Sequence, residues 1–280
     1  MELLYKVVGI SRQAFQQHRI KTDRQLHGIE PLIESIRALR SDHPRLSCRK
    51  IYRILQPNHL GRDRFEQFCF RHGFKLYRKR SYHRTTDSRG VTRFDNLLPH
   101  RELSGVNQVW VSDITYYRIG ERYYYITLIM DRFSRAIVGQ SVAKTLHTDV
   151  TTLPALKEAI KNRMPGKGLI IHSDGGGQYY AKEFKHLTSH GQLLNSMGKC
   201  AYDNPHAERL NGTIKNDYLI HYKPSNFNEL SEMLERSVYN YNNYRPHTSL
   251  KEFTPTQFEI QMQAFGANTK KHLLLKKVQE

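Results

Sequence analysis

The sequence has little of what defines several protein classes. Its three cysteines, Cys48, Cys69 and Cys200, are spread over 280 residues, which argues against a disulfide framework and against metal ligation by paired cysteines. Buried reduced thiols are the simpler interpretation. No stretch approaches the roughly 18 consecutive apolar residues of a membrane helix, and residues 1–10 lack the long apolar core of a signal peptide. We therefore expect a cytoplasmic chain without a membrane partner.

Acidic residues are scarce relative to basic ones. The chain has 44 Lys and Arg against 26 Asp and Glu, a net charge of +18. Residues 1–104 hold 22 basic and 10 acidic residues, or +12, and residues 105–280 hold 22 and 16, or +6. Basic and aromatic residues alternate between 77 and 94, a mixture that suits phosphate pairing and base stacking. A solvated basic face is the alternative, but the asymmetry favours nucleic acid over a membrane surface.

Residues 1–80 predict a small region of short helices. An apolar face repeats with helical spacing over residues 30–40, Ser47 can cap a second helix, and Gly61 breaks the chain before a third helix over 62–72. Such a helix-turn-helix pair can lay its second member in the major groove of DNA. The side chains available there for phosphates or base edges are those of Arg62, Arg64 and Arg71. Helix pairs also occur in proteins that never touch DNA.

A weaker candidate for a helix pair precedes this one, over residues 7–18. Gly9 and Ser11 could make its turn before a helix over 12–17. Residues 81–104 lose all periodicity and indicate a basic linker.

Residues 105–265 change to an α/β pattern. Three stretches rich in β-branched and aromatic residues, 108–118, 122–131 and 136–142, predict an antiparallel meander. The strands and helices expected after it are a helix over 148–163, a strand over 169–172, a helix over 181–190, a strand over 193–196, a helix from Pro205, and a helical segment over 227–260 with a break at Pro246. This order predicts a mixed five-stranded sheet with flanking helices. Residues 266–280 read as a basic tail.

Three carboxylates stand out by their positions. Asp113 lies inside the first strand, where a lone carboxylate is costly to bury unless a cation neutralises it. Asp174 ends the strand over 169–172 and precedes three glycines, and Glu208 lies in the helix after the last strand. Each has an ordinary explanation: an ion pair, a turn, or a solvent-facing side chain. Their conjunction indicates a site.

The helix that carries Glu208 can place it over a strand end. Asn204 can cap this helix and Pro205 can open it. At 100° per residue, Glu208, Asn211 and Lys215 share one face. The helix can therefore turn these three side chains toward the sheet.

Carboxylates without cysteine or clustered histidine select hard cations such as Mg²⁺. Two ions roughly 3.5–4 Å apart can activate the attacking oxygen and stabilise the leaving oxygen of an in-line phosphoryl displacement. The GxxxxGK[ST] pattern of ATP-hydrolysing enzymes is absent. We expect two Mg²⁺, with Mn²⁺ as a substitute, held by Asp113, Asp174 and Glu208.

Several ordered motifs together resemble one known family. They are WVSDITY at 110–116, IMDRFSR at 129–135, HSDGGGQY at 172–179, SM at 196–197, DNPHAE at 203–208 and YNNYRPH at 241–247. They resemble the OrfB transposase chain of insertion sequences of the IS-three type, a family similar to retroviral integrases. The resemblance runs from about residue 30 to 260.

The resemblance implies a ribonuclease-H-like catalytic core whose acids match Asp113, Asp174 and Glu208. It implies a Mg²⁺-dependent enzyme that cleaves the 3′ ends of a mobile element and transfers them to target DNA. It also implies that residues near 30–80 form the family's DNA-binding helix-turn-helix module. The partners expected are the terminal inverted repeats, target DNA and, because two ends must be joined in concert, further copies of the chain.

Other residues receive secondary roles. Lys215, with Asn211 beside it, is expected to contact a phosphate near the scissile bond, an ordinary surface lysine being the alternative. His172 could contact DNA, orient Asp174, or be structural. Asp131 is expected to be structural, paired with Arg132 or Arg135. The remaining pair expected to line the DNA path, in a segment that could equally be a helix end, is Arg245 and His247.

The sequence departs from the family pattern in three ways. Only 33 residues separate Asp174 from Glu208, slightly fewer than usual, and the shortening falls in the loop over 197–203. No upstream coiled coil is present, so an OrfA partner or fusion from a preceding frame is expected. The integrase zinc module, a His pair followed by a Cys pair, is missing, so zinc is not expected.

Two other functions fit the same residues. One is a sequence-specific DNA-binding protein whose core has lost catalysis, and the other is a nuclease or resolvase on the same fold, since fold does not fix reaction.

Overall fold

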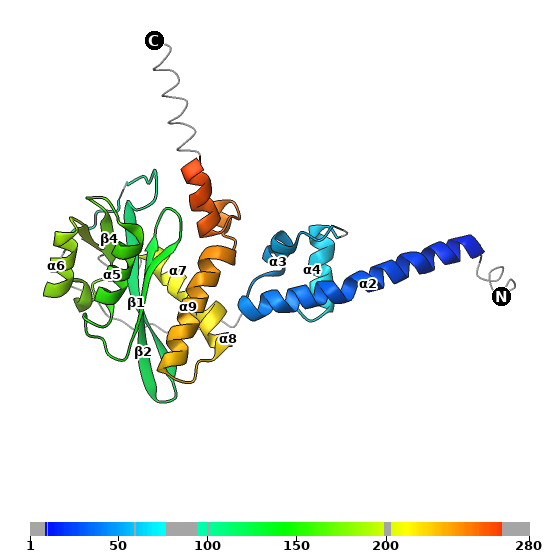
Figure 1. Cartoon of the computed structure of the whole chain (residues 1–280), viewed down its shortest axis with the longest axis horizontal. Helices are drawn as coiled ribbons and strands as arrows, with labels where there is room; N and C mark the ends of the chain where they lie inside the picture. Colours follow the sequence, from blue (N-terminus) through cyan, green and yellow to red (C-terminus); the bar gives the residue numbers. More distant parts are fainter. Residues whose placement is uncertain are drawn as a thin grey trace, which may run out of the picture. The chain divides into compact units, whose positions relative to one another are not determined.

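The computed structural model describes Gly9 and residues 11–58, 60–76, 94–99, 101–198 and 203–264, without the side chains of 18–28. The chain divides into two compact units, Met1–Arg78 and Lys79–Glu280, seen in Figure 1. Outside the described residues lie Cys200, the basic and aromatic cluster over 77–93, most of the predicted linker and the predicted tail.

Among its described residues, the first unit has one long helix and two short ones: α2 (Arg12–Asp42), α3 (Cys48–Leu55) and α4 (Arg62–Arg71). The expectation of short helices is wrong for the first, because α2 starts at a cap in which Ser11 accepts from the Ala14 N–H and continues through Pro31. Helix-forming Gln and Arg residues extend it where no apolar periodicity signals a helix. Gly9, with a φ of +68°, supplies the turn expected before it.

The predicted pair of helices after Ser47 is confirmed. Ser47 accepts from the Lys50 N–H at the start of α3, and α4 begins after Gly61. The buried side chains that join them to α2 are Ile36, Leu46, Cys48, Ile51, Phe65 and Cys69. Cys48 and Cys69 are buried free thiols, as expected.

The second unit is built on a five-stranded sheet, as predicted. Its strands are β1 (Val109–Ile119), β2 (Arg122–Asp131), β3 (Ile137–Ala143), β4 (Ile170–Ser173) and β5 (Leu194–Met197), in the order β3-β2-β1-β4-β5. The first three are antiparallel, and β4 and β5 run parallel to β1. β4 pairs with β1 only through Val109, Trp110 and Val111. Beyond Val111 the edge of β1 is free of β4.

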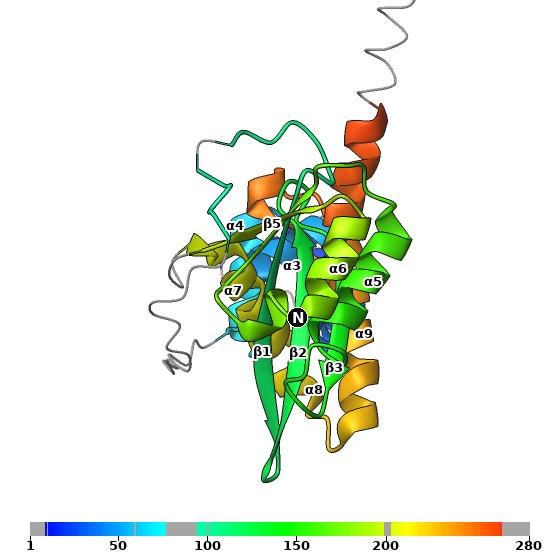
Figure 2. The same ribbon diagram turned by 90° about the vertical axis from the view of Figure 1, so that its left-hand side faces the viewer.

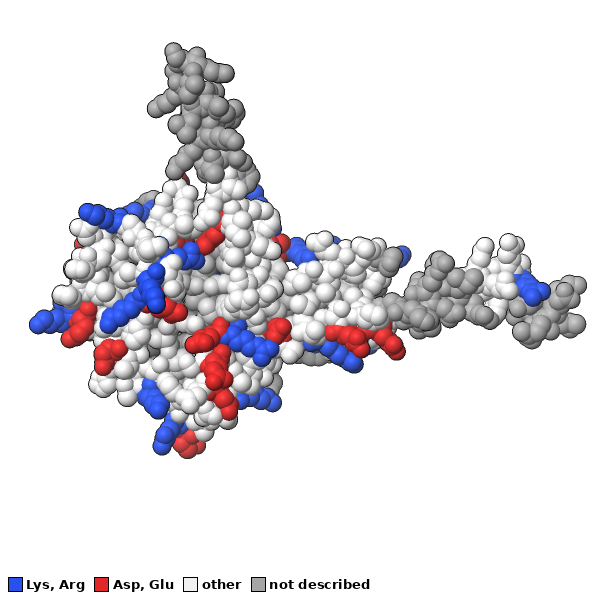
Figure 3. Space-filling model, viewed as in Figure 1, with Lys and Arg blue, Asp and Glu red and all other residues white. Residues whose placement is uncertain are grey.

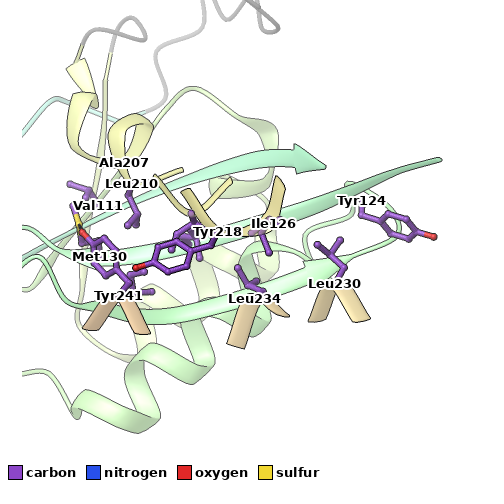
Figure 4. Packing of buried hydrophobic residues seen from close by; sticks show 14 of the residues in the cluster. Val111, Tyr124, Ile126, Met130, Ala207, Leu210, Tyr218, Leu230, Leu234 and Tyr241 are labelled. Carbon is purple, nitrogen blue, oxygen red and sulfur yellow. Dashed lines mark hydrogen bonds between the residues drawn. The ribbon is translucent and has the colours of Figure 1, made fainter. Parts of the chain in front are cut away.

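Successive apolar residues along the strands point to opposite faces of the sheet and so contribute to two hydrophobic cores. Odd-numbered Val109 and Val111 of β1 pack with α7 (Pro205–Thr213) and α9 (Phe227–Tyr244), as Figure 4 shows for Val111, Leu210 and Tyr241. Trp110, on the opposite face, packs with α5 (Thr152–Arg163) and α6 (Lys182–His190). The sheet is therefore covered by helices on both faces (Figure 2).

Gly139 permits the close contact between β3 and α5. A Cβ on Gly139 would lie 2.2 Å from the carbonyl oxygen of Ala155 and 2.9 Å from the Cβ of Ala159. A larger residue would therefore push α5 off the sheet.

Side chains cover the edge of the sheet at β3, and at β5 the Met197 N–H donates to the Asp95 carbonyl at 3.4 Å. On β3, the Asn242 amide accepts from the Ile137 N–H and donates to the Ile137 carbonyl, both at 2.9 Å. Glu158 accepts from the Gln140 N–H on the same strand. On β5, Ser196 accepts from the Leu97 N–H.

The predicted helices differ from the observed ones mainly at their ends. α5 begins at Thr152 rather than 148, because Thr151 donates both its N–H and its hydroxyl to the His147 carbonyl and forms a turn. The break predicted at Pro246 is confirmed: α9 ends at Tyr244, and a further helix covers 255–264. α7 continues without interruption into a π-helical segment (Ile214–Leu219) and then α8 (Ile220–Tyr222). Within the described residues, no helix combines the length and apolar content that crossing a membrane requires.

Candidate active site

Asp113 lies on β1 just where β4 stops pairing with it. Its Oδ1 accepts from the Ile114 N–H at 2.9 Å, and its Oδ2 accepts from the Asn211 amide at 2.8 Å. Burial, followed by the charge of Asp174 and a smaller effect of Glu208, raises the pKa of Asp113 to about 7. A buried carboxyl with two other carboxylates near it favours the binding of a proton or a metal cation.

Asp174 follows the end of β4 and lies beside Asp113. Val111 pairs with His172 in the parallel register. Asp113 and Asp174 each lie two residues after this pair, so they are neighbours across the two strands. The Oδ1 of Asp174 accepts from the Gly176 N–H at 3.1 Å, and burial raises the pKa of this carboxyl. The turn predicted from the glycines is therefore present and holds one carboxylate oxygen.

Glu208 lies in the first turn of α7 and is exposed. Pro205 opens this helix, as expected, but Asn204 does not cap it. Its amide donates instead to the Ser112 carbonyl of β1 at 2.9 Å, because the start of α7 packs directly against that strand. This bond fixes the helix of Glu208 to the strand of Asp113.

Tyr179 is a buried residue beside the acids that the sequence-based prediction did not include. It lies in a short 3₁₀ turn (Gly177–Tyr179), and its hydroxyl is 2.9 Å from the Ser112 hydroxyl. Burial and the charges of Asp174 and Asp113 raise the pKa of Tyr179. The sequence did contain a signal for this residue, namely an aromatic side chain shortly after the carboxylate at the end of a strand. In the structure Tyr179 lies near both Asp174 and Asp113.

Asn211 and Lys215 both face β1, as their spacing from Glu208 predicts. Asn211 is buried and contacts Asp113. The Lys215 ammonium donates to the Tyr116 carbonyl at 3.0 Å and lies 5.0 Å from the centre of the Tyr116 ring. Burial lowers the pKa of this half-buried lysine, and its contact with a phosphate stays a prediction.

The DNA contact predicted for His172 does not fit its position. The residue is wholly buried, its Nδ1 is 2.9 Å from the Ser196 hydroxyl of β5, and burial lowers its pKa to about 4. It bridges two strands as a neutral side chain, which corresponds to the structural alternative.

Arg245 and His247 are also engaged inside the unit. Arg245 donates to Asp217 at 2.7 Å in an ion pair whose two side chains are 13% and 23% exposed. The His247 ring packs edge-on against Tyr241, with ring centres 4.7 Å apart. Both residues contact α9 or the π-helical segment, and that they line a DNA path stays a prediction.

Asp131 is structural, as expected, but its predicted arginine partners are wrong. Its carboxylate accepts from the backbone N–H groups of Asn107, Phe133 and Ser134 at 2.6–3.0 Å. Phe133 and Ser134 reach Asp131 because the chain turns sharply between β2 and β3, and Asn107 reaches it from the segment before β1.

Arg135 instead contacts His206 in the first turn of α7. Its Nη1 lies 2.7 Å from the His206 Nδ1. Burial and the charges of Arg135, Arg132 and Arg209 lower the pKa of His206 to about 4. Three arginines therefore gather around one neutral histidine.

Arg62, Arg64 and Arg71 in the first unit are all exposed on α4. Arg62 pairs with its neighbour Asp63 at 2.8 Å, and both side chains are largely solvated. On the face shown in Figure 3, basic and acidic side chains of the described residues intermingle. The excess positive charge thus forms no single continuous patch on that face.

The acids fit a hard cation by their chemistry. Asp113, Asp174 and Glu208 offer only oxygen donors, which Mg²⁺ and Mn²⁺ prefer. Within the described part of the chain, no three His, Cys, Asp or Glu side chains are grouped closely enough to hold a metal ion as they stand. The three acids are therefore suitable ligands for such an ion by their chemistry, but their side chains would have to move closer together to bind it.

This chain is similar to several known proteins. Two family models, both described as "Integrase core domain", match residues 104–201 and 192–255. The catalytic core domain of HTLV-2 integrase, solved in complex with magnesium, covers 59% of this chain and 99% of its own, with 25% identity and a TM-score of 0.46.

Two relatives bear on the family. A 31 kDa protein of insertion element IS600 from Shigella sonnei is 31% identical over 268 residues, 90% of this chain and 96% of the relative. The transposase InsF for insertion sequence IS3A of Escherichia coli (strain K12) is 32% identical over 178 residues, 61% of this chain and 60% of that relative. The chain thus spans nearly all of one relative and under two thirds of the other. It belongs to the IS3-type insertion-sequence transposases, with a ribonuclease-H-like integrase core of the DDE polynucleotidyl transferase class.

Proposed function

We propose that this chain cleaves the 3′ ends of its insertion sequence and transfers them to target DNA. The observation that carries the proposal is that acids from three separate elements lie near enough for the charges of two of them to raise the pKa of the third. Asp113 comes from β1, Asp174 from the end of β4 and Glu208 from α7, and the charges of the latter two both act on Asp113. Such a group suits phosphoryl transfer at a divalent cation.

Asp113, Asp174 and Glu208 would hold the metal. Two bound Mg²⁺, or Mn²⁺ in their place, would supply the charge that stabilises the attacking and leaving oxygens of an in-line displacement. Asp113 must release its proton to act as a ligand, and the Ile114 N–H and the Asn211 amide hold its two oxygens in place. Tyr179 keeps bulk water from beneath the site because it is buried there.

DNA would contact both units. Lys215 lies on the helical face that carries Asn211, and its ammonium could exchange the Tyr116 carbonyl for a phosphate near the scissile bond. Arg62, Arg64 and Arg71 would bind the element's terminal inverted repeat, since all three are exposed on one helix of a helix pair. The coupled joining of two ends requires further copies of the chain, and an upstream-frame OrfA segment is the other protein partner proposed.

Strand transfer of a labelled oligonucleotide tests the proposal. The oligonucleotide carries the element's end, and the chain is incubated with it, a plasmid target and Mg²⁺ or Mn²⁺. Asp113→Asn, Asp174→Asn and Glu208→Gln should each abolish joined product, whereas Glu121→Gln, at an exposed acid of the same unit, should not.

The outcomes separate the alternative functions. Hydrolysis without joined product would indicate a nuclease, and binding to the end without any metal-dependent cleavage would indicate a DNA-binding protein that has lost catalysis. Either result would overturn the proposed reaction.

A further inference from the structure

Three arginines and a histidine meet at the turn between β2 and β3. Arg132 and Arg135 belong to the turn, while His206 and Arg209 lie three residues apart on α7, on one face of the helix. Arg135 is 2.7 Å from His206, and the charges of Arg132 and Arg209 act on both members of this contact. We call these four residues the arginine cluster.

The positive charge of the cluster is offset only in part by Asp131, whose charge acts on Arg135. Among the described residues, none of the three arginines is in an ion pair, and the buried Nη1 of Arg132 has no hydrogen-bond partner. Asp131, the nearest acid along the chain, is engaged by three backbone N–H groups. A guanidinium nitrogen removed from water without an acceptor is costly unless an anion completes it.

The backbone also favours an anion at this place. The side chain of Asn204 leaves the N-terminus of α7 uncapped, so the positive end of the helix dipole faces the same region. Arg135 adopts a φ of +64°, a conformation that a non-glycine residue rarely takes. The turn holds the guanidinium in place at the expense of backbone strain.

The cluster lies close to the acids but separate from them. Trp110 of β1 pairs with Asp131, and Asp113 lies three residues further along β1, about 10 Å at about 3.3 Å per residue. A phosphate at the cluster would therefore belong to the same short stretch of DNA strand as one at Asp113.

We propose that Arg132, Arg135, Arg209 and His206 form a binding site for a DNA backbone phosphate near the bond that is cut. The role of this site rests on the proposed function: a phosphate bound there would fix the position of the DNA strand relative to the three acids. The ligand class is a phosphodiester anion.

A coupling experiment on binding alone tests the site. The full chain is titrated, in EDTA, into a fluorescein-labelled duplex of the element's end, over about 50–200 mM salt. Arg209→Gln removes an exposed member of the cluster, and Arg132→Gln removes the buried one. Arg122→Gln, at an exposed position on β2 outside the cluster, is the matched control.

Each cluster variant should weaken binding and reduce the slope of log K against log salt by about 1, and Arg122→Gln should change neither as much. Duplexes with one neutral methylphosphonate at successive positions near the cut locate the partner. At one position the neutral linkage should weaken wild-type binding but have no further effect on Arg209→Gln. Thermal unfolding of each variant shows whether it is folded, and Arg132→Lys should restore the slope if charge is what matters.

Equal effects of Arg209→Gln and Arg122→Gln, with no coupled phosphate, would overturn the proposal. If inorganic phosphate raises the Tm of wild type but not of Arg209→Gln, and no methylphosphonate is coupled, the site binds free phosphate and not DNA. Because binding is measured without metal, a coupled phosphate in a chain that never cleaves DNA would refute the proposed reaction and leave the site standing. Normal strand transfer by a chain that shows no coupled phosphate would refute the phosphate site and leave the proposed reaction standing.

Discussion

Asp113 and Asp131 lie on adjacent strands of one sheet, and burial raises the pKa of both. Their surroundings differ. Asp131 accepts three backbone N–H bonds and faces no other carboxylate of the candidate site. Asp113 accepts one backbone N–H and one amide, and it faces Asp174 and Glu208.

The difference separates a structural carboxylate from one suited to function. The Asp131 carboxylate is satisfied by three backbone N–H groups of the protein itself. At Asp113 like charges are gathered without a cation from the protein, an arrangement that perturbs pKa values at functional sites. Four changes sharpen or break this comparison.

The largest expected effect is on catalysis. Asp113→Asn should lower metal-dependent strand transfer by on the order of 10³-fold or more, because a ligand to the cation is lost. Asp131→Asn, assayed on protein that remains folded, should lose less than about tenfold. Similar losses in both variants would show that the two carboxylates do not differ in role.

The free energy of unfolding should respond in the opposite order. Asp131→Asn should lower it by about 1–3 kcal/mol, since an amide cannot accept all three N–H bonds. Urea unfolding at neutral pH measures the loss, and Asp149→Asn, at an exposed acid, is the control. An unchanged midpoint would mean that the three bonds add nothing.

Asp113→Asn should stabilise the metal-free fold at pH 8, by about 1–2 kcal/mol. The folded pKa of about 7 lies above the ordinary value of 3.8, so the folded state binds the proton more tightly. The contribution of Asp113 to stability is thus fully present below about pH 4 and is lost as pH rises through about 7. Unfolding followed from pH 4 to 8 should show a steeper decline in wild type than in the variant, and parallel curves would contradict the raised pKa.

The smallest effect is expected beneath the acids. Tyr179→Phe should lower the free energy of unfolding by about 1 kcal/mol, because it removes the contact with the Ser112 hydroxyl. Tyr123→Phe, at a tyrosine that is 48% exposed, should have no effect. If Ser112→Ala and Tyr179→Phe prove strictly additive in a double-mutant cycle, the two hydroxyls do not interact.

The sheet and its order of elements were predictable because they depend on local patterns. Strand residues such as Val109, Trp110 and Val111 alternate between two cores, and the period of two is visible in any strand. α2 was not predictable at its full length, because its first half shows no apolar period.

The acids of the candidate site could be named from sequence, but their partners could not. Each acid stands at a strand end, inside a strand or in a first helical turn, positions that the pattern reveals. The bond from Asn204 to the Ser112 carbonyl and the pairing of Arg245 with Asp217 depend on how α7 and α9 approach the sheet. Local propensity carries no information on that approach.

The amide of Asn242 has a consequence for how copies of the chain associate. Its two bonds to Ile137 imitate a neighbouring strand, and Glu158 occupies a further backbone group of the same strand, the Gln140 N–H. A blocked edge resists the strand addition that leads to fibrous aggregation. Copies brought together on paired DNA ends at high local concentration would therefore associate through side-chain surfaces, and the assembly could come apart again after the DNA is joined.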